Sequence, residues 1–146
     1  MLEASAPRLL TENEVIVAVN AALKARRWEI VSFATTAQAG IDIHATRGSE
    51  TLYVEAKGVT SSKESSSRFG KVQSASQLFI QIAAALLKCA ELKSASPTAC
   101  VAMATPDHPG MRNRVARIEP TLKAADIGVL WVSDDGSVTG WNADWF

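Results

Sequence analysis

At 146 residues and 15.6 kDa, the chain has the size of a single domain, and its 15 Lys and Arg residues balance its 15 Asp and Glu residues. The hydrophobic fraction of 47% and the charged fraction of 21% are ordinary for a globular protein. These values exclude a disordered chain, a collagen-like repeat and a coiled coil. We therefore expect one domain that covers residues 1–146.

Further features of the sequence narrow the class of protein. The longest apolar run, from Ile82 to Leu87, is far too short to span a membrane, and residues 1–7 lack the pattern of a secretory signal. Cys89 and Cys100 are too few for a disulfide framework, and no cluster of His and Cys has the spacing of a zinc site. We expect a cytoplasmic protein that does not associate with a membrane.

Positive and negative charges are sorted along the chain. Residues 61–125 hold nine Lys and Arg against four Asp and Glu, whereas residues 126–146 hold four Asp and no basic residue. A basic segment can bind nucleic acid, because Lys and Arg neutralise phosphates and release counterions. The alternative is a solvated surface on which charges of one sign cluster by chance, and the charge pattern alone favours this alternative.

The first half of the chain contains a predicted helix followed by three strands. Thr11 and Glu14 form a capping-box pattern, and helical spacing of apolar residues follows over residues 12–26. A strand and a β-hairpin come next, at residues 28–35, 41–46 and 52–57. The hairpin is indicated by two alternating apolar and polar runs joined by a short turn at Gly48.

The second half of the chain alternates helices and strands. A helix is predicted over residues 72–93, followed by a buried strand over 98–104 and one helix from Pro109 to about Ala125. Two further strands are predicted, at residues 127–132 and after the turn at Asp134-Asp135-Gly136. The order α-β-β-β-α-β-α-β-β predicts an α/β fold in which a central mixed sheet has helices on both faces.

The hairpin carries one group of residues that is suited to bind a metal ion. Glu55 and Lys57 lie two residues apart and therefore share a face of their strand, and Asp42 lies opposite the Glu55 region on the other strand. Two carboxylates and an ammonium group at one end of a hairpin suit Mg²⁺, which binds one or two carboxylates together with water and phosphate oxygens. A solvent-exposed face with a cross-strand ion pair would give the same pattern.

The segments Gly40-Ile41-Asp42-Ile43 and Leu52-Tyr53-Val54-Glu55-Ala56-Lys57-Gly58 resemble the PD-(D/E)XK nuclease superfamily. In that superfamily an Asp and a Glu-x-Lys lie on adjacent strands of an α-β-β-β-α-β core, and the resemblance covers roughly residues 11–132. The Ser65–Lys71 segment, the Gln77 helix and Ala104-Thr105-Pro106 also look like a bacterial branch of this superfamily. The resemblance implies a restriction-endonuclease-like fold.

The resemblance also implies roles for individual residues. Asp42 and Glu55 would bind Mg²⁺ or Mn²⁺ together with the backbone carbonyl of Ala56, and Lys57 would act on the reacting phosphate. Glu14 occupies the place of a metal-binding Glu on the first helix, although it also fits the capping box alone. The row Gln73, Gln77 and Gln81 would include a residue that faces the site, with Gln77 the best placed, or would form a polar helix edge.

The function expected from the resemblance is that of a metal-dependent endonuclease that hydrolyses phosphodiester bonds of nucleic acid, with DNA as the expected substrate. Lys63, Arg68 and Lys71 lie in a Ser-rich segment after the Lys57 strand and would contact the nucleic-acid backbone. Two alternatives are a non-catalytic nucleic-acid-binding or assembly subunit with this fold, and a small α/β interaction domain in which the motif is accidental.

A nuclease with one active site often forms a homodimer in order to cut both strands of a duplex. The C-terminal aromatic residues are candidates for a dimer interface or for a cap over the end of the sheet; they are Trp131, Trp141, Trp145 and Phe146.

Overall fold

The computed structural model describes residues 9–33, 40–60 and 73–146, and Lys63, Arg68 and Lys71 therefore lie outside the described residues. The described residues form an α/β fold with four helices and six strands. In chain order the elements are α1 (Glu12–Ala25), β1 (Glu29–Phe33), β2 (Ile43–Arg47), β3 (Glu50–Ala56), α2 (Ala75–Ala95), β4 (Cys100–Pro106), α3 (Pro109–Ala116), α4 (Glu119–Ala125), β5 (Ile127–Val132) and β6 (Val138–Trp141).

The six strands form one mixed sheet in which the spatial order β1-β2-β3-β4-β5-β6 follows the chain order. The pairs β1–β2, β2–β3 and β5–β6 are antiparallel, whereas β3–β4 and β4–β5 are parallel. The parallel pairs require crossovers, which α2 supplies between β3 and β4, and which α3 and α4 supply between β4 and β5. The predicted mixed sheet and β-hairpin are confirmed.

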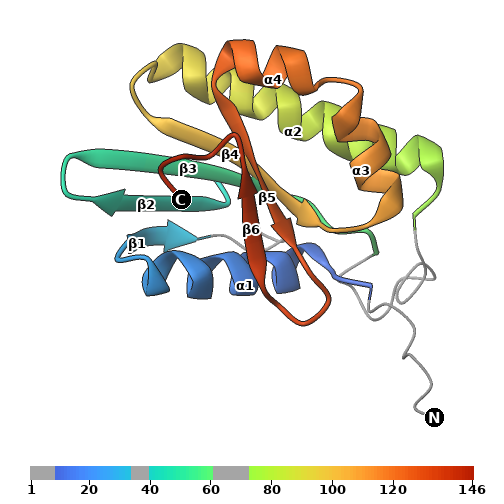
Figure 1. Ribbon diagram of the computed structural model, residues 1–146, viewed down its shortest axis with the longest axis horizontal. Helices are drawn as coiled ribbons and strands as arrows, with labels where there is room; N and C mark the ends of the chain where they lie inside the picture. The colour runs from blue at the N-terminus through green and yellow to red at the C-terminus, as the bar shows by residue number, and fades with distance from the viewer. Residues whose placement is uncertain (1–8, 34–39, 61–72) are drawn as a thin grey trace.

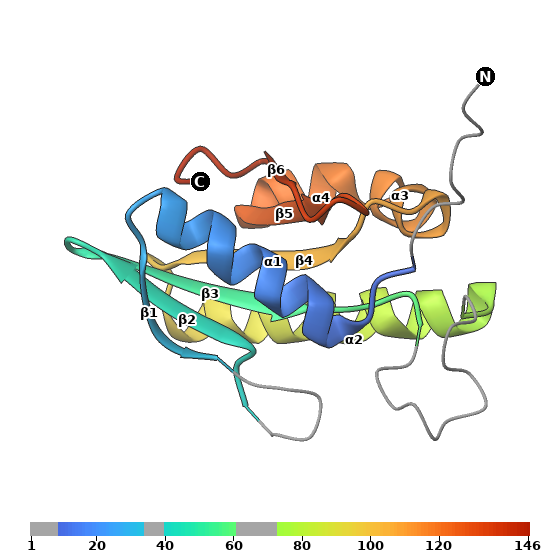
Figure 2. The same cartoon turned by 90° about the horizontal axis from the view of Figure 1, so that it is seen from below.

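Two hydrophobic cores lie on opposite faces of the sheet. α1 covers one face, where Val15, Val19 and Leu23 pack against Leu52 and Val54 of β3. The other three helices cover the opposite face, which Figures 1 and 2 show as a layer on the far side of the sheet from α1. The residues of this second core include Leu78, Ile82, Val101, Met103, Met111, Leu122 and Val129. Alternation along each strand therefore sends apolar side chains into both layers.

The segment from residue 109 to residue 125 contains two helices, so the prediction of one continuous helix is wrong. α3 ends at Ala116 and α4 begins at Glu119. Pro120 in the first turn of α4 has no backbone N–H, and in a continuous helix its ring would collide with the carbonyl of Ala116. The chain therefore breaks before Pro120, where a first helical turn tolerates proline.

Of the described residues, one helix is long and apolar enough to cross a membrane by length and composition. This helix is α2, which has 21 residues and a mean hydropathy of 1.3. The sequence run from Ile82 to Leu87 did not indicate this, because Gln77, Gln81 and Lys88 interrupt the apolar residues. In the structure one side of α2 packs on the sheet through Leu78, Ile82, Ala85 and Cys89.

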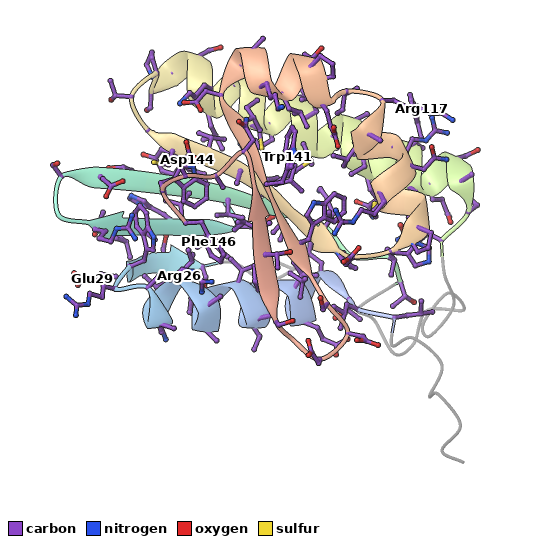
Figure 3. All side chains as sticks on the ribbon, in the orientation of Figure 1. Arg26, Glu29, Arg117, Trp141, Asp144 and Phe146 are labelled. Atoms are coloured by element: carbon purple, nitrogen blue, oxygen red, sulfur yellow. The ribbon has the colours of Figure 1, made fainter. Side chains whose placement is uncertain are left out.

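The C-terminal aromatic residues pack against their own chain. The ring of Trp145 meets the ring of Trp28 edge to face, with centroids 6.1 Å apart. The guanidinium group of Arg26 lies 3.8 Å from the centroid of the Phe146 ring, and Figure 3 shows these two residues next to each other at the end of α1. Arg47 also donates a hydrogen bond of 2.6 Å to the carbonyl of Trp145. The tail thus caps the sheet beside β2.

Candidate active site

Asp42 and Glu55 face each other across the β2–β3 hairpin. Ile43 pairs with Val54 in this antiparallel register, and the next pair outward is therefore Asp42 and Glu55. Both residues are nearly covered, with 9% and 8% of their surfaces exposed. Oδ2 of Asp42 accepts a hydrogen bond of 2.8 Å from the backbone N–H of Ala56, which holds the Asp42 carboxylate beside the end of β3. The structure thus brings these two predicted residues together.

The carboxyl group of Glu55 lies in an environment that disfavours its charged form. Burial raises the pKa of Glu55 to about 7, and the charge of Asp42 and a side-chain hydrogen bond with Asp42 add to the effect. The positive charges of Lys57 and Lys88 oppose this rise in pKa. Oε1 of Glu55 is buried and has no hydrogen-bond partner among the described residues. A buried acceptor without a partner is costly, and a bound cation would relieve that cost.

Lys57 comes directly after β3 and lies close to the first turn of α1. Its Nζ is 4.0 Å from Oε1 of Glu12, and the two side chains are 17% and 20% exposed. Burial raises the pKa of Glu12, the charge of Asp42 raises it further, and the charge of Lys57 lowers it. Glu12 is therefore a third carboxylate at the same end of the sheet as Asp42 and Glu55.

A close crossing of two backbone segments positions Lys57 beside α1. The N–H of Val59 donates a hydrogen bond of 3.0 Å to the carbonyl of Leu10, and Thr11 and Thr60 form a parallel β-bridge. Gly58 makes this crossing possible, because a Cβ atom at this position would collide with the backbone nitrogen of Glu12. Gly58 therefore helps to place Lys57 beside α1.

Glu14 caps the N-terminus of α1. Its Oε1 accepts a hydrogen bond of 3.2 Å from the N–H of Thr11, and its own N–H donates one of 3.2 Å to Oγ1 of Thr11. The predicted capping box is confirmed. Glu12, two residues earlier, interacts electrostatically with Asp42 and Lys57. A role for Glu14 as a metal ligand stays a prediction, and Glu12 is the better placed of the two carboxylates.

Helix α2 carries two of the predicted glutamines and one lysine that acts on the acidic group. The Oε1 atom of Gln77 accepts a hydrogen bond of 2.9 Å from the N–H of Ser74 and completes a capping box, so Gln77 has a structural task at the start of the helix. Nε2 of Gln81 donates a hydrogen bond of 3.2 Å to Oε1 of Gln73. Further along α2, Lys88 is the side chain whose charge acts on Glu55. A catalytic role for Gln77 stays a prediction.

Cys89 lies near the acidic group but is not suited to act as a nucleophile. The residue is fully buried in the core beneath α2. Burial raises the pKa of its thiol to about 12, and the negative charge of Glu55 adds to the effect. The thiol is therefore protonated at neutral pH, whereas a nucleophilic cysteine reacts as a thiolate. The interpretation of Cys89 as a small core residue agrees with this environment.

The donor set fits a hard divalent cation that keeps some of its water ligands. Within the part of the chain that the structure describes, no group of three or more His, Cys, Asp and Glu residues forms a ready metal cage. Mg²⁺ does not require such a cage, because one or two carboxylates are enough when water and phosphate oxygens complete its shell. The unpaired Oε1 of Glu55 and the neighbouring Asp42 carboxylate would be these two ligands.

Comparisons with known proteins found solved structures with a similar fold. Two solved structures are similar over 88% of this chain and 98% of their own. They are an fdxN element excision controlling factor protein from Anabaena variabilis, with a TM-score of 0.56, and an XisH family protein from Nostoc punctiforme, with a TM-score of 0.55. The likeness is one of fold. At 18% sequence identity for each, it carries no activity from those proteins to this chain. No family model matches the sequence, and no curated protein does.

Proposed function

We propose that the chain is a metal-dependent nuclease of the PD-(D/E)XK superfamily, with a restriction-endonuclease-like core, that hydrolyses phosphodiester bonds in DNA. The observation that carries this proposal is the pairing of Asp42 with Glu55 across the hairpin, with Lys57 two residues after Glu55. The α-β-β-β-α-β order of the first six elements is the order that this superfamily has.

Asp42 and Glu55 would hold Mg²⁺ or Mn²⁺, with the Ala56 carbonyl as a further expected ligand. When bound, the metal would lower the pKa of a water molecule and offset charge on phosphate oxygens. The protein itself contributes position and charge, which are the main requirements of phosphoryl transfer. Asp42 is held in place by the N–H of Ala56, and it therefore does not have to reorganise when substrate arrives.

Lys57 would act on the phosphate that is cleaved. Its ammonium group is a compact point charge with three N–H donors, and an ion pair with Glu12 keeps it near Asp42 and Glu55. An ammonium group near the phosphate stabilises the negative charge that increases in the transition state. The positive charge of Lys88 adds to the same field from α2. These two lysines would partly offset the repulsion between the carboxylates and a polyanionic substrate.

A second candidate function is supported by the name of one structural neighbour. The Anabaena variabilis protein is named an excision controlling factor, which describes control and not cleavage. By this analogy the chain would bind DNA, or assemble with a DNA-processing enzyme, without cutting. The presence of both Asp42 and Glu55 with Lys57 favours the nuclease, because a binding subunit has no need for two carboxylates that repel phosphate.

Incubation of the protein with single-stranded, duplex and branched DNA in the presence of Mn²⁺, Mg²⁺ or a chelator distinguishes these candidates. The nuclease predicts cleavage that the chelator abolishes and that Glu55→Gln abolishes with it. The controlling subunit predicts DNA binding without cleavage. If the protein neither binds nor cuts any of the three substrates with either metal, the nuclease and the DNA-binding subunit are both wrong.

A further inference from the structure

The outward face of α2 carries apolar side chains where a solvent-facing helix usually carries charged ones. From Ala75 to Leu87 the helix contains no charged residue. Ile80 is 63% exposed, Leu87 is 62% exposed and Phe79 is 53% exposed. The inward face of α2 is already occupied by the sheet, so these side chains have no place in the core of their own domain.

The exposed positions follow a regular spacing along α2. Six exposed residues of α2, which we call the α2 seam, are Ser76, Ile80, Ala83, Leu87, Ala90 and Ser94. Successive residues of the seam lie alternately four and three positions apart, which is the heptad spacing of two helices that pack along their length. The seam follows one line along a helix of 21 residues, which is roughly 30 Å long.

We propose that the α2 seam binds the same seam of a second copy of this chain, with the two helices antiparallel. The side chains in the middle of the seam alternate between small and large, and a serine lies at each end. A twofold axis through the centre of the seam places Ile80 opposite Ala90 of the second copy, and Leu87 opposite Ala83. Each large side chain then meets an alanine, so the two backbones approach to the same distance at each of these layers. The seam is therefore complementary to itself.

Other occupants fit the seam less well. A parallel dimer would place Leu87 against Leu87 and Ala83 against Ala83, and these unequal layers would leave cavities beside the alanines. A membrane would have to surround α2, but Leu78 and Ile82 hold the opposite face on the sheet. The seam contains no residue of the candidate active site, so the dimer does not depend on the proposed function.

Two single substitutions in the seam test whether it forms the dimer interface. Ala83→Leu makes a homodimer in which two leucines meet at each central layer, whereas Leu87→Ala makes one in which two alanines meet. Each variant alone should dimerise at least about tenfold more weakly than the wild type in sedimentation velocity, because one is overpacked and the other underpacked. An equimolar mixture should recover tight association, because each central layer of the mixed dimer again pairs one leucine with one alanine.

The double variant Ala83→Leu/Leu87→Ala reports the direction of the helices. Mixed with the wild type, it gives one leucine–leucine and one alanine–alanine layer if the helices are antiparallel, but two matched leucine–alanine layers if they are parallel. The antiparallel arrangement therefore predicts that the double variant dimerises with itself in preference to the wild type, and preferential pairing with the wild type would overturn it.

The control is Val17→Lys, which changes an exposed apolar residue of α1 that is 69% exposed and lies outside the seam. It should leave the dissociation constant of the dimer unchanged, and circular dichroism should show that every variant is folded. The proposal is overturned if the wild type stays monomeric at every concentration, whether or not it sediments with phospholipid vesicles. It is also overturned if the mixture associates no better than its components, or if Val17→Lys weakens the dimer equally.

Discussion

Oδ2 of Asp42 accepts a hydrogen bond of 2.8 Å from the backbone N–H of Ala56. This one bond ties the residue before β2 to the last residue of β3, and it fixes the Asp42 carboxylate next to Glu55. The closeness of the two carboxylates has a cost in the metal-free protein, because the charge of Asp42 raises the pKa of Glu55. The same closeness is an advantage once a divalent cation binds between them.

Neutralising Asp42 should lower the pKa of Glu55. Asp42→Asn removes the negative charge that, after burial, is the next largest cause of the raised pKa. The fold should survive, because Asn keeps an oxygen that can accept the N–H of Ala56. NMR titration of the Glu55 side chain would measure the shift. Calorimetric titration of the same variant with Mn²⁺ should show affinity reduced by about tenfold or more, since a charged ligand has become neutral.

The metal-free protein should lose stability as the pH rises from about 4.5 to about 7. The pKa of Glu55 is about 7 in the folded protein against 4.5 in the unfolded chain, so the folded state binds the proton more tightly. Over this interval the unfolded chain releases its proton while the folded protein keeps it, so the free energy of unfolding falls. Above about pH 7 both states have lost the proton, and this contribution to the free energy of unfolding no longer changes. Thermal melts at several pH values should show this contribution in the wild type and not in Glu55→Gln. Parallel profiles for the two proteins would contradict the environment assigned to Glu55.

The two carboxylates at the start of α1 should behave differently when they are removed. Glu14→Ala deletes half of the capping box, and it should cost about 1 kcal/mol of stability while leaving Mn²⁺ binding intact. Glu12→Ala removes the carboxylate that contacts Lys57, and it should weaken Mn²⁺ binding or slow cleavage with little loss of stability. Thermal melts, Mn²⁺ titrations and cleavage assays of both variants make the comparison. If Glu14→Ala weakened Mn²⁺ binding and Glu12→Ala did not, Glu14 and not Glu12 would be the carboxylate of the metal site.

A side chain at position 58 should destabilise the crossing of the chain after β3 with the start of α1. In Gly58→Ala the new Cβ meets the backbone of Thr11 and Glu12, which cannot move as a side-chain tip can. We expect a loss of about 1–3 kcal/mol, typical of overpacking. Gly40→Ala is the matched control, because Gly40 has open space around it and a φ of 117°, and it should show only the cost of that backbone conformation. Urea unfolding of both variants would measure the difference.

The residues on the hairpin could be placed from the sequence because a strand has a period of two. Alternation puts Glu55 and Lys57 on one face, and the short turn at Gly48 sets the register that brings Asp42 opposite Glu55. Glu12 could not be chosen over Glu14 in this way. The choice depends on the direction from which the chain after β3 crosses the start of α1, and Gly58 determines that crossing. The sequence shows a glycine directly after Lys57, but only the fold shows that this glycine lies against the backbone of Thr11 and Glu12.

The contribution of α2 was harder to predict for a related reason. Helical periodicity identifies the face that is buried, but it does not show which flank of that face lies over the carboxylates. The flank includes Lys88, an isolated charged residue in an apolar stretch that no sequence pattern distinguishes. Lys88→Gln should raise the pKa of Glu55, because it removes a positive charge that lowers it. An unchanged NMR titration of Glu55 would show that Lys88 lies too far away to matter.

The measurement that tests the central claim most directly is the rate of DNA cleavage by Lys57→Ala under single-turnover conditions with saturating Mn²⁺. The claim predicts that this variant binds metal and DNA nearly as the wild type does, yet cleaves about 10²-fold more slowly or worse, because Lys57 acts on the transition state. Lys24→Ala, which removes an exposed lysine near the far end of α1, should cleave at the wild-type rate. Cleavage by Lys57→Ala at the wild-type rate would contradict the claim.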